Sequence, residues 1–195
     1  MLATMFPGQG AQRLSMGDGL FDRFAHLCAE ADDVLGYSIR DLCMEGPIER
    51  LTETQFTQPA LYVVNALQYL AFVEDSGEKP DYLLGHSDSE YVALYAADVL
   101  DFVGGLRLVQ KRGALMAQAK GGGMAAVLGL TAQQVEDIIV RNGLNDVYAA
   151  NFNTPKQIVV SGKKEAIVAA EQSFEDAGAM LYRVLAVSGA FHSPF

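Results

Sequence analysis

The sequence is poor in basic residues and has no long apolar run. Lysine and arginine total 14 against 24 aspartates and glutamates, which gives a formal net charge of −10. This charge repels nucleic-acid phosphates and anionic lipids, so we expect neither nucleic acid nor a membrane as a partner. No apolar stretch reaches the roughly 20 residues that span a bilayer, and no basic segment followed by an apolar one opens the chain. We therefore expect a soluble, cytoplasmic protein.

Cysteine is also scarce. Cys28 and Cys43 lie in segments with helical patterns. Their spacing matches neither zinc ligands nor the disulfide framework of small secreted domains, so we expect no metal site and a reducing environment. Apolar residues, by contrast, make up 50% of the 195 residues, enough for a substantial core.

Alternating strand and helix patterns predict an α/β fold in two parts. Residues 2–6 and 82–86 resemble short buried strands, and helical periodicity covers the segments between and after them. Beyond the glycines at 121–123, the pattern runs β-α-β-β-α-β, the order of a ferredoxin-like unit. We predict one domain of residues 1–120 and 188–195, with residues 121–187 inserted as a ferredoxin-like subdomain.

Ser87 lies on a predicted strand-to-helix turn. The run from Gly85 to Ser89, GHSDS, approximates the G-x-S-x-G nucleophile elbow, which exposes a serine hydroxyl beside the first amides of a helix. Such amides stabilise the negative charge that acyl transfer develops on the carbonyl oxygen. The alternative is that Ser87 only caps the following helix.

A serine nucleophile needs a base, and the chain has three histidines. His26 lies in an apolar-rich helical segment and is interpreted as structural. His86 points to the opposite side of its strand from Ser87, which suits a supporting or substrate-contacting role. His192 follows the predicted subdomain in a loop that could return to Ser87, although an ordinary surface-loop histidine is the alternative.

Arg112 is flanked at three and four residues by apolar side chains, namely Leu108, Val109, Leu115 and Met116. A guanidinium on an inward face needs an anionic partner. The partner is either the free carboxylate of a dicarboxylic acyl group or a buried aspartate or glutamate, and the sequence does not choose between them.

The loop of residues 7–10, PGQG, follows the first predicted strand, where loops of α/β proteins gather around a site. A donor at Gln9 could face the oxyanion. The alternative is that its two glycines serve only to form the turn.

Together these motifs resemble the malonyl-CoA:acyl-carrier-protein transacylase family, most closely the stand-alone, trans-acting acyltransferases of polyketide synthases. The matching stretches cover nearly the whole chain in the family's order: FPGQGAQ at 6–12, TQPAL at 57–61, GHSxxEY at 85–91, ALYAADVLDF at 93–102, LVQKRGALM at 108–116, GMAAVLGL at 123–130, NFNTPKQIVVSG at 151–162 and GAFH at 189–192. The resemblance implies an α/β-hydrolase-like larger domain and no permanently bound cofactor.

The resemblance also implies an activity in fatty acid or polyketide synthesis. Ser87 attacks the thioester of malonyl-CoA while His192 accepts its proton, and the malonyl ester then passes to the phosphopantetheine thiol of an acyl carrier protein. Backbone amides of Gln9 and Asp88 form the oxyanion hole. Arg112 binds the malonyl carboxylate and Gln58 lines the pocket.

The family's histidine motif carries a further implication. Phe191, which precedes His192, resembles the malonyl-selecting form of the motif, because phenylalanine leaves less room for an α-methyl group. The family continues beyond this histidine, so we expect a C-terminally shortened chain with an incomplete larger domain.

Two positions depart from the family's GHSLGE pattern: Asp88 replaces an apolar residue and Ser89 replaces glycine. The added side chain at position 89 predicts strain of about 1–3 kcal/mol if the site does not relax. The carboxylate at position 88 gains from a helix N-terminus but opposes a nearby oxyanion. Two alternatives follow: an acyl-carrier-protein hydrolase that keeps the nucleophile, or a remnant that binds a carrier protein without catalysis.

Overall fold

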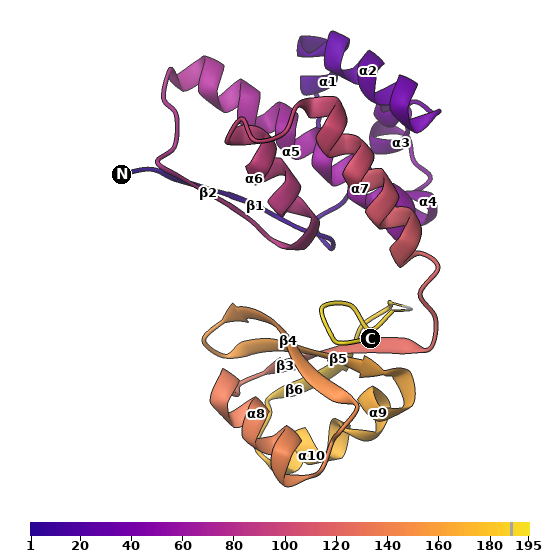
Figure 1. Ribbon diagram of the computed structural model, residues 1–195, viewed down its shortest axis with the longest axis vertical. Helices are drawn as coiled ribbons and strands as arrows, with labels where there is room; N and C mark the ends of the chain where they lie inside the picture. The colour runs from indigo at the N-terminus through magenta and orange to yellow at the C-terminus, as the bar shows by residue number, and fades with distance from the viewer. Residues whose placement is uncertain (188) are drawn as a thin grey trace. The chain divides into compact units, whose positions relative to one another are not determined.

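The computed structural model describes residues 1–187 and 189–195 and divides the chain into two compact units, Met1–Ala117 and Gln118–Phe195 (Figure 1). The predicted α/β class is confirmed, since helices and strands alternate in both units. The division falls three residues before the boundary expected at 120/121. The assignment of residues 188–195 to the larger domain stays a prediction.

Two parallel strands and a group of helices form the first unit. Strand β1 (Ala3–Phe6) pairs with β2 (Tyr82–Gly85), with Ala3 opposite Tyr82 and Phe6 opposite Gly85. The helices are α1 (Leu20–Arg23), α2 (Ala25–Leu35), α3 (Ile39–Met44), α4 (Ile48–Thr52), α5 (Thr54–Ser76), the 3-10 turn η1 (Ser87–Ser89), α6 (Glu90–Ala96) and α7 (Phe102–Met116). The parallel pairing sets the end of β1 beside the end of β2, where the loop at 7–10 and the turn at Ser87 begin.

Helix α5 forms the centre of this unit. Every residue from Thr57 to Leu67 is buried, so this stretch is surrounded by the core, and its polar members Thr57, Gln58 and Asn65 are buried with the apolar ones. Helix α7 approaches it closely at Gly105, where a Cβ would lie 2.2 Å from Tyr62 Oη. The Tyr62 hydroxyl donates to the carbonyl of Phe102 at 3.1 Å. None of the helices in the described residues is long and apolar enough to cross a membrane.

The structure corrects four details of the predicted helices. The apolar spacing between Leu20 and Leu35 predicts a single helix with Asp18 as its N-cap, but the helix is broken at Phe24, whose ring is buried, so packing of that ring overrides the helical periodicity. The N-cap of α1 is Gly19, which has a left-handed conformation. The helix predicted to follow Ser87 as far as Leu100 ends at Ala96. Helix α3 contains Cys43, whose segment has a helical pattern, whereas the short helix α4 had no counterpart in the predicted pattern.

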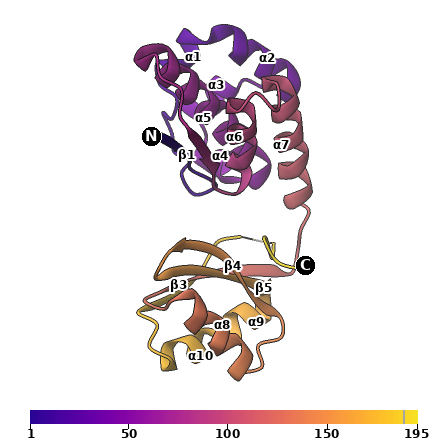
Figure 2. The same ribbon diagram turned by 60° about the vertical axis from the view of Figure 1, so that its left-hand side comes forward.

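The second unit is a four-stranded antiparallel sheet with helices on one face (Figures 1 and 2). Its elements are β3 (Gly122–Leu128), α8 (Ala132–Arg141), β4 (Val147–Thr154), β5 (Gln157–Lys163), α9 (Lys164–Ala169), α10 (Glu171–Asp176) and β6 (Leu181–Val184). The strands lie in the order β4-β5-β3-β6. This is the expected β-α-β-β-α-β sequence with the second helix divided at Ala170, and the ferredoxin-like description stays an interpretation of it.

Candidate active site

Ser87 is the first residue of η1, two residues after the end of β2, and has a left-handed backbone conformation with φ 58°. Such a value is uncommon outside glycine and concentrates at functional sites. The turn is tight, because a Cβ on Gly85 would lie 2.2 Å from the backbone nitrogen of Glu90. Glycine at position 85 thus lets the strand and the following helix pack closely and leaves Ser87 at the turn between them.

Ser89 is fully buried but hydrogen-bonded. Its hydroxyl donates to the carbonyl of Pro7 at 2.7 Å and accepts from Asn65 Nδ2 at 3.1 Å. Asn65 also donates to the carbonyl of Pro7 at 3.1 Å. The backbone of Ser89 is right-handed (φ −76°, ψ −3°), a conformation that any residue adopts. Its dihedral angles therefore show no sign of the strain that was expected for a side chain at this position. Instead, Ser89 and Asn65 together join the loop after β1 to the turn that carries Ser87.

The loop at 7–10 packs against the turn through Gly8. A Cβ on Gly8 would lie 2.5 Å from the carbonyl oxygen of His86 and 2.7 Å from its Nδ1. The side chain of Gln9 is directed to the start of α5, where Nε2 donates to Thr54 Oγ1 at 3.3 Å. His86 therefore lies beside this loop, and its supporting or substrate-contacting role stays a prediction.

Arg112 reaches Ser87 from α7, with Nη2 donating to Ser87 Oγ at 3.2 Å. Its Nη1 is buried and has no hydrogen-bond partner in the part of the chain that the structure describes. No ion pair joins Arg112 to an aspartate or glutamate within 4.0 Å among residues 1–187 and 189–195. A buried guanidinium nitrogen without a partner is costly, so this side of the site suits an incoming carboxylate.

Gln58 on α5 is fully buried. Its Nε2 contacts Met116 Sδ at 3.0 Å, and its Oε1 has no hydrogen-bond partner within the described residues. Buried amide oxygens normally accept a hydrogen bond. Gln58 thus offers one acceptor that a bound group could satisfy.

Asp88 is fully buried directly after Ser87, and neither of its carboxyl oxygens has a hydrogen bond of standard geometry to any described residue. Burial raises the pKa of this carboxyl to about 6. The guanidinium of Arg112, the backbone amides of Asp88 and Gln9, and His86 act in the opposite direction on this pKa. The same two backbone amides are the expected oxyanion-hole donors, so the carboxyl of Asp88 lies close to them.

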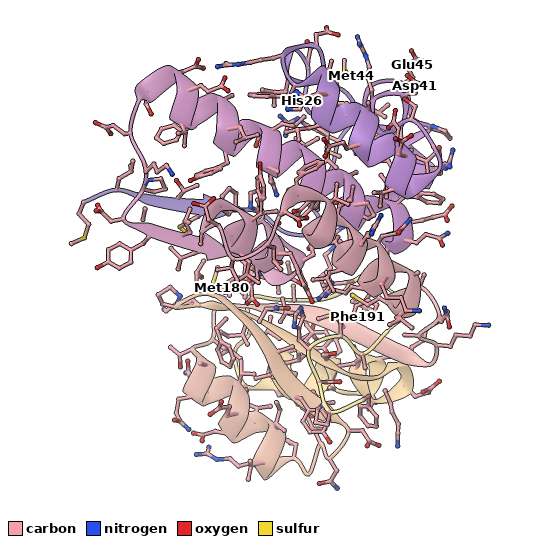
Figure 3. All side chains as sticks on the ribbon, turned by 45° about the horizontal axis from the view of Figure 1, so that its top comes forward. His26, Asp41, Met44, Glu45, Met180 and Phe191 are labelled. Atoms are coloured by element: carbon pink, nitrogen blue, oxygen red, sulfur yellow. The ribbon has the colours of Figure 1, made fainter. Side chains whose placement is uncertain are left out.

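Phe191 and His192 belong to the second unit, in a segment fixed by close backbone contacts (Figure 3 labels Phe191). A Cβ on Gly122, at the start of β3, would lie 2.0 Å from the backbone nitrogen of Ala190. His192 has a left-handed backbone, with φ 56°. The structure thus holds this segment against β3, and its pairing with Ser87 stays a prediction.

The structure brings together Ser87, Asp88, Arg112, His86 and the Gln9 loop within the first unit. His26 is exposed on α2, contrary to the structural role expected from its apolar neighbours (Figure 3).

Sequence reasoning missed Asn65. An amide within the run of buried residues on α5 was the available signal, because buried polar groups need partners.

The chain matches known acyltransferases along almost its whole length. Residues 4–195 match the family described as acyl transferase domain. Polyketide biosynthesis malonyl CoA-acyl carrier protein transacylases are similar: BaeC of Bacillus velezensis is 52% identical and PksC of Bacillus subtilis is 53% identical, each over 100% of this chain and 68% of the relative. The chain therefore spans about two thirds of the length of these relatives.

Solved structures agree. The malonyl CoA-acyl carrier protein transacylase from Burkholderia pseudomallei is 55% identical, with a TM-score of 0.93 over 99% of this chain and 67% of that one. A type II polyketide synthase acyl-carrier protein in complex with its malonyl-transacylase is also similar, at 38% identity and a TM-score of 0.87 over 96% of this chain and 63% of that one. The chain therefore belongs to the acyl transferase domain family, in its malonyl-CoA:acyl-carrier-protein transacylase branch.

Proposed function

We propose that this chain transfers a malonyl group from malonyl-CoA, through an ester on Ser87, to the phosphopantetheine thiol of an acyl carrier protein in the cytoplasm. The observation that carries the proposal is Arg112, which donates to Ser87 Oγ at 3.2 Å while its second terminal nitrogen is buried without a partner among the described residues. The names and structures of the relatives support the same reaction.

In the first half-reaction, Ser87 Oγ attacks the thioester carbonyl and its proton passes to His192. The carbonyl oxygen becomes an oxyanion, which accepts hydrogen bonds from the backbone amides of Gln9 and Asp88. The carbon–sulfur bond then breaks, and the CoA thiolate leaves with the proton from His192. A malonyl ester remains on Ser87.

In the second half-reaction, His192 takes the proton of the carrier-protein thiol, and the sulfur attacks the ester. The carbon–oxygen bond to Ser87 breaks, and the serine oxygen regains a proton from His192. Throughout, the guanidinium of Arg112 binds the free carboxylate of the malonyl group and Gln58 contributes to the lining. Phe191 restricts the space for an α-methyl substituent.

The test is incubation with radiolabelled malonyl-CoA followed by mapping of the labelled residue. We expect label on Ser87 and none in the Ser87→Ala variant. A folded wild-type protein that acquires no label under these conditions would refute the proposal.

The role of Arg112 has its own test. Arg112→Leu should lower ester formation with malonyl-CoA by about 100-fold while affecting acetyl-CoA much less, because only the malonyl group has a carboxylate to bind. The matched control is Arg107→Leu, since Arg107 is exposed on the same helix. Equal losses with both thioesters would contradict the assignment.

A chain that binds a carrier protein without catalysis is the second candidate. The buried carboxyl of Asp88 favours it, because a negative charge beside Ser87 opposes oxyanion formation. The double variant Asp88→Leu, Ser89→Gly should then create ester formation that the wild-type chain lacks. Equal rates in both proteins would reject this candidate.

A further inference from the structure

Asp88 contributes only its backbone amide to the proposed reaction, yet its side chain has an unusual environment. The residue is fully buried, directly follows the nucleophile, and has two carboxyl oxygens without a hydrogen bond of standard geometry in the described chain. A buried carboxyl in this condition is costly and normally has a structural partner or a function. The groups that interact with it are Arg112, His86 and the backbone amides of Gln9 and Asp88.

The charged and polar groups around Asp88 come from several elements. Arg112 on α7 and His86 directly after β2 interact electrostatically with it, and so do the backbone amides of Gln9 and Asp88, the expected oxyanion-hole donors. Glu90 at the start of α6 is exposed. From α5, the uncharged Asn65 is hydrogen-bonded to the neighbouring Ser89. Arg112 Nη2 donates to Ser87 Oγ at 3.2 Å, and the buried Asp88 directly follows Ser87, so Arg112 is the cation that this carboxyl shares with the acyl site.

We propose that Asp88 is a specificity-determining residue whose carboxylate competes with the carboxylate of the acyl group for Arg112, so that its ionisation lowers the preference for malonyl over neutral acyl groups. This inference rests on the proposed function. When Asp88 is neutral, the positive charge of Arg112 is available to the substrate. When Asp88 is ionised, it partly neutralises that charge and repels a second carboxylate in the same small volume.

The ratio of malonyl to acetyl transfer separates this effect from others in the site. Both acyl groups develop the same oxyanion and need the same base, so charge effects on those steps cancel in the ratio. Only the malonyl group carries a carboxylate that Asp88 repels and Arg112 attracts. Because burial raises the pKa of Asp88 to about 6, the ratio of malonyl to acetyl transfer should change at pH values near 6.

The experiment measures initial rates of ester formation on Ser87 with malonyl-CoA and with acetyl-CoA between about pH 5 and about pH 8. For the wild-type chain we expect the malonyl-to-acetyl ratio to fall by about tenfold as the pH rises through this range. The Asp88→Asn variant should keep a constant, high ratio. The matched control, Asp98→Asn, removes an exposed carboxylate just beyond the C-terminus of α6 and should retain the wild-type profile.

Each outcome decides the question. A ratio that is independent of pH in the wild-type chain, or a pH dependence that survives in Asp88→Asn, overturns the inference and leaves the proposed function intact. Failure of both folded proteins to form an ester with either thioester overturns the proposed function as well. The wild-type profile needs no variant, so the inference is testable even if Asp88→Asn folds poorly.

Discussion

Replacing Asp88 by asparagine should change the pH dependence of stability. The carboxyl is buried and its pKa is about 6 in the folded chain, against an ordinary value of 3.8. The folded state therefore binds this proton more tightly than the unfolded state does. The stabilisation from this group is fully present below about pH 4 and is lost as the pH rises toward about pH 6.

The size of the effect follows from the pKa difference. At about 1.4 kcal/mol per pKa unit, the ionised carboxyl costs the folded chain about 3 kcal/mol above about pH 7. Asp88→Asn removes this cost, although the buried amide introduces a penalty that does not vary with pH. The free energy of unfolding of the variant, relative to wild type, should thus rise by about 3 kcal/mol between about pH 4 and about pH 7.

The assay is denaturant unfolding of both proteins at several pH values, followed by hydrogen exchange in α5. That helix reports the first unit alone, since each unit has its own core. Asp98→Asn is the control for loss of one exposed charge. A difference between Asp88→Asn and wild type that stays constant with pH would refute the reasoning, because it would mean that the carboxyl has the same pKa in both states.

Three further variants test the close contacts of the site. Gly8→Ala places a methyl group 2.5 Å from the carbonyl oxygen of His86 and should lower the melting temperature and slow ester formation, by thermal melts and labelling of Ser87. Gly122→Ala places one 2.0 Å from a backbone nitrogen of the His192 segment and should lower kcat far more than it changes the stability of the first unit. Asn65→Ala removes a buried amide that donates to two acceptors and should cost about 1–3 kcal/mol of unfolding free energy; a change below about 0.5 kcal/mol would contradict its role.

Local patterns predicted the long elements well. Helices α5 and α7 were recognisable because their 23 and 15 residues are enough to show a helical period. Strands β1 and β2 have four residues each and lie where apolar runs were expected, but most of their residues are exposed or half-buried and not buried as predicted. Helix α4 has only five residues, too few for a helical period to stand out, whereas the segment of α3 around Cys43 did show a helical pattern. The break at Phe24 could not be predicted from the sequence pattern, because it depends on where the buried ring of Phe24 packs in the folded chain.

The sequence predicted which residue types form the candidate site, but it predicted fewer of the contacts between them. Spacing alone placed Arg112 on an inward face, but its hydrogen bond to Ser87 Oγ joins two elements distant in sequence, α7 and the turn after β2. Asp88 was expected to benefit from a helix N-terminus, yet η1 turns its side chain into the interior. Burial of that carboxyl depends on elements distant in sequence, so no local pattern could reveal it.

At position 87, the backbone conformation favours glycine for stability, whereas the proposed reaction needs the serine hydroxyl. A residue with a Cβ pays about 1 kcal/mol or more for this conformation, whereas glycine adopts it freely. A library of variants at position 87 that is selected only for resistance to heat or denaturant should therefore be enriched in glycine. The glycine variants would lack the nucleophilic hydroxyl. If serine were retained at position 87 under selection for stability alone, the cost of its left-handed backbone would not be what limits the stability of the fold at this position.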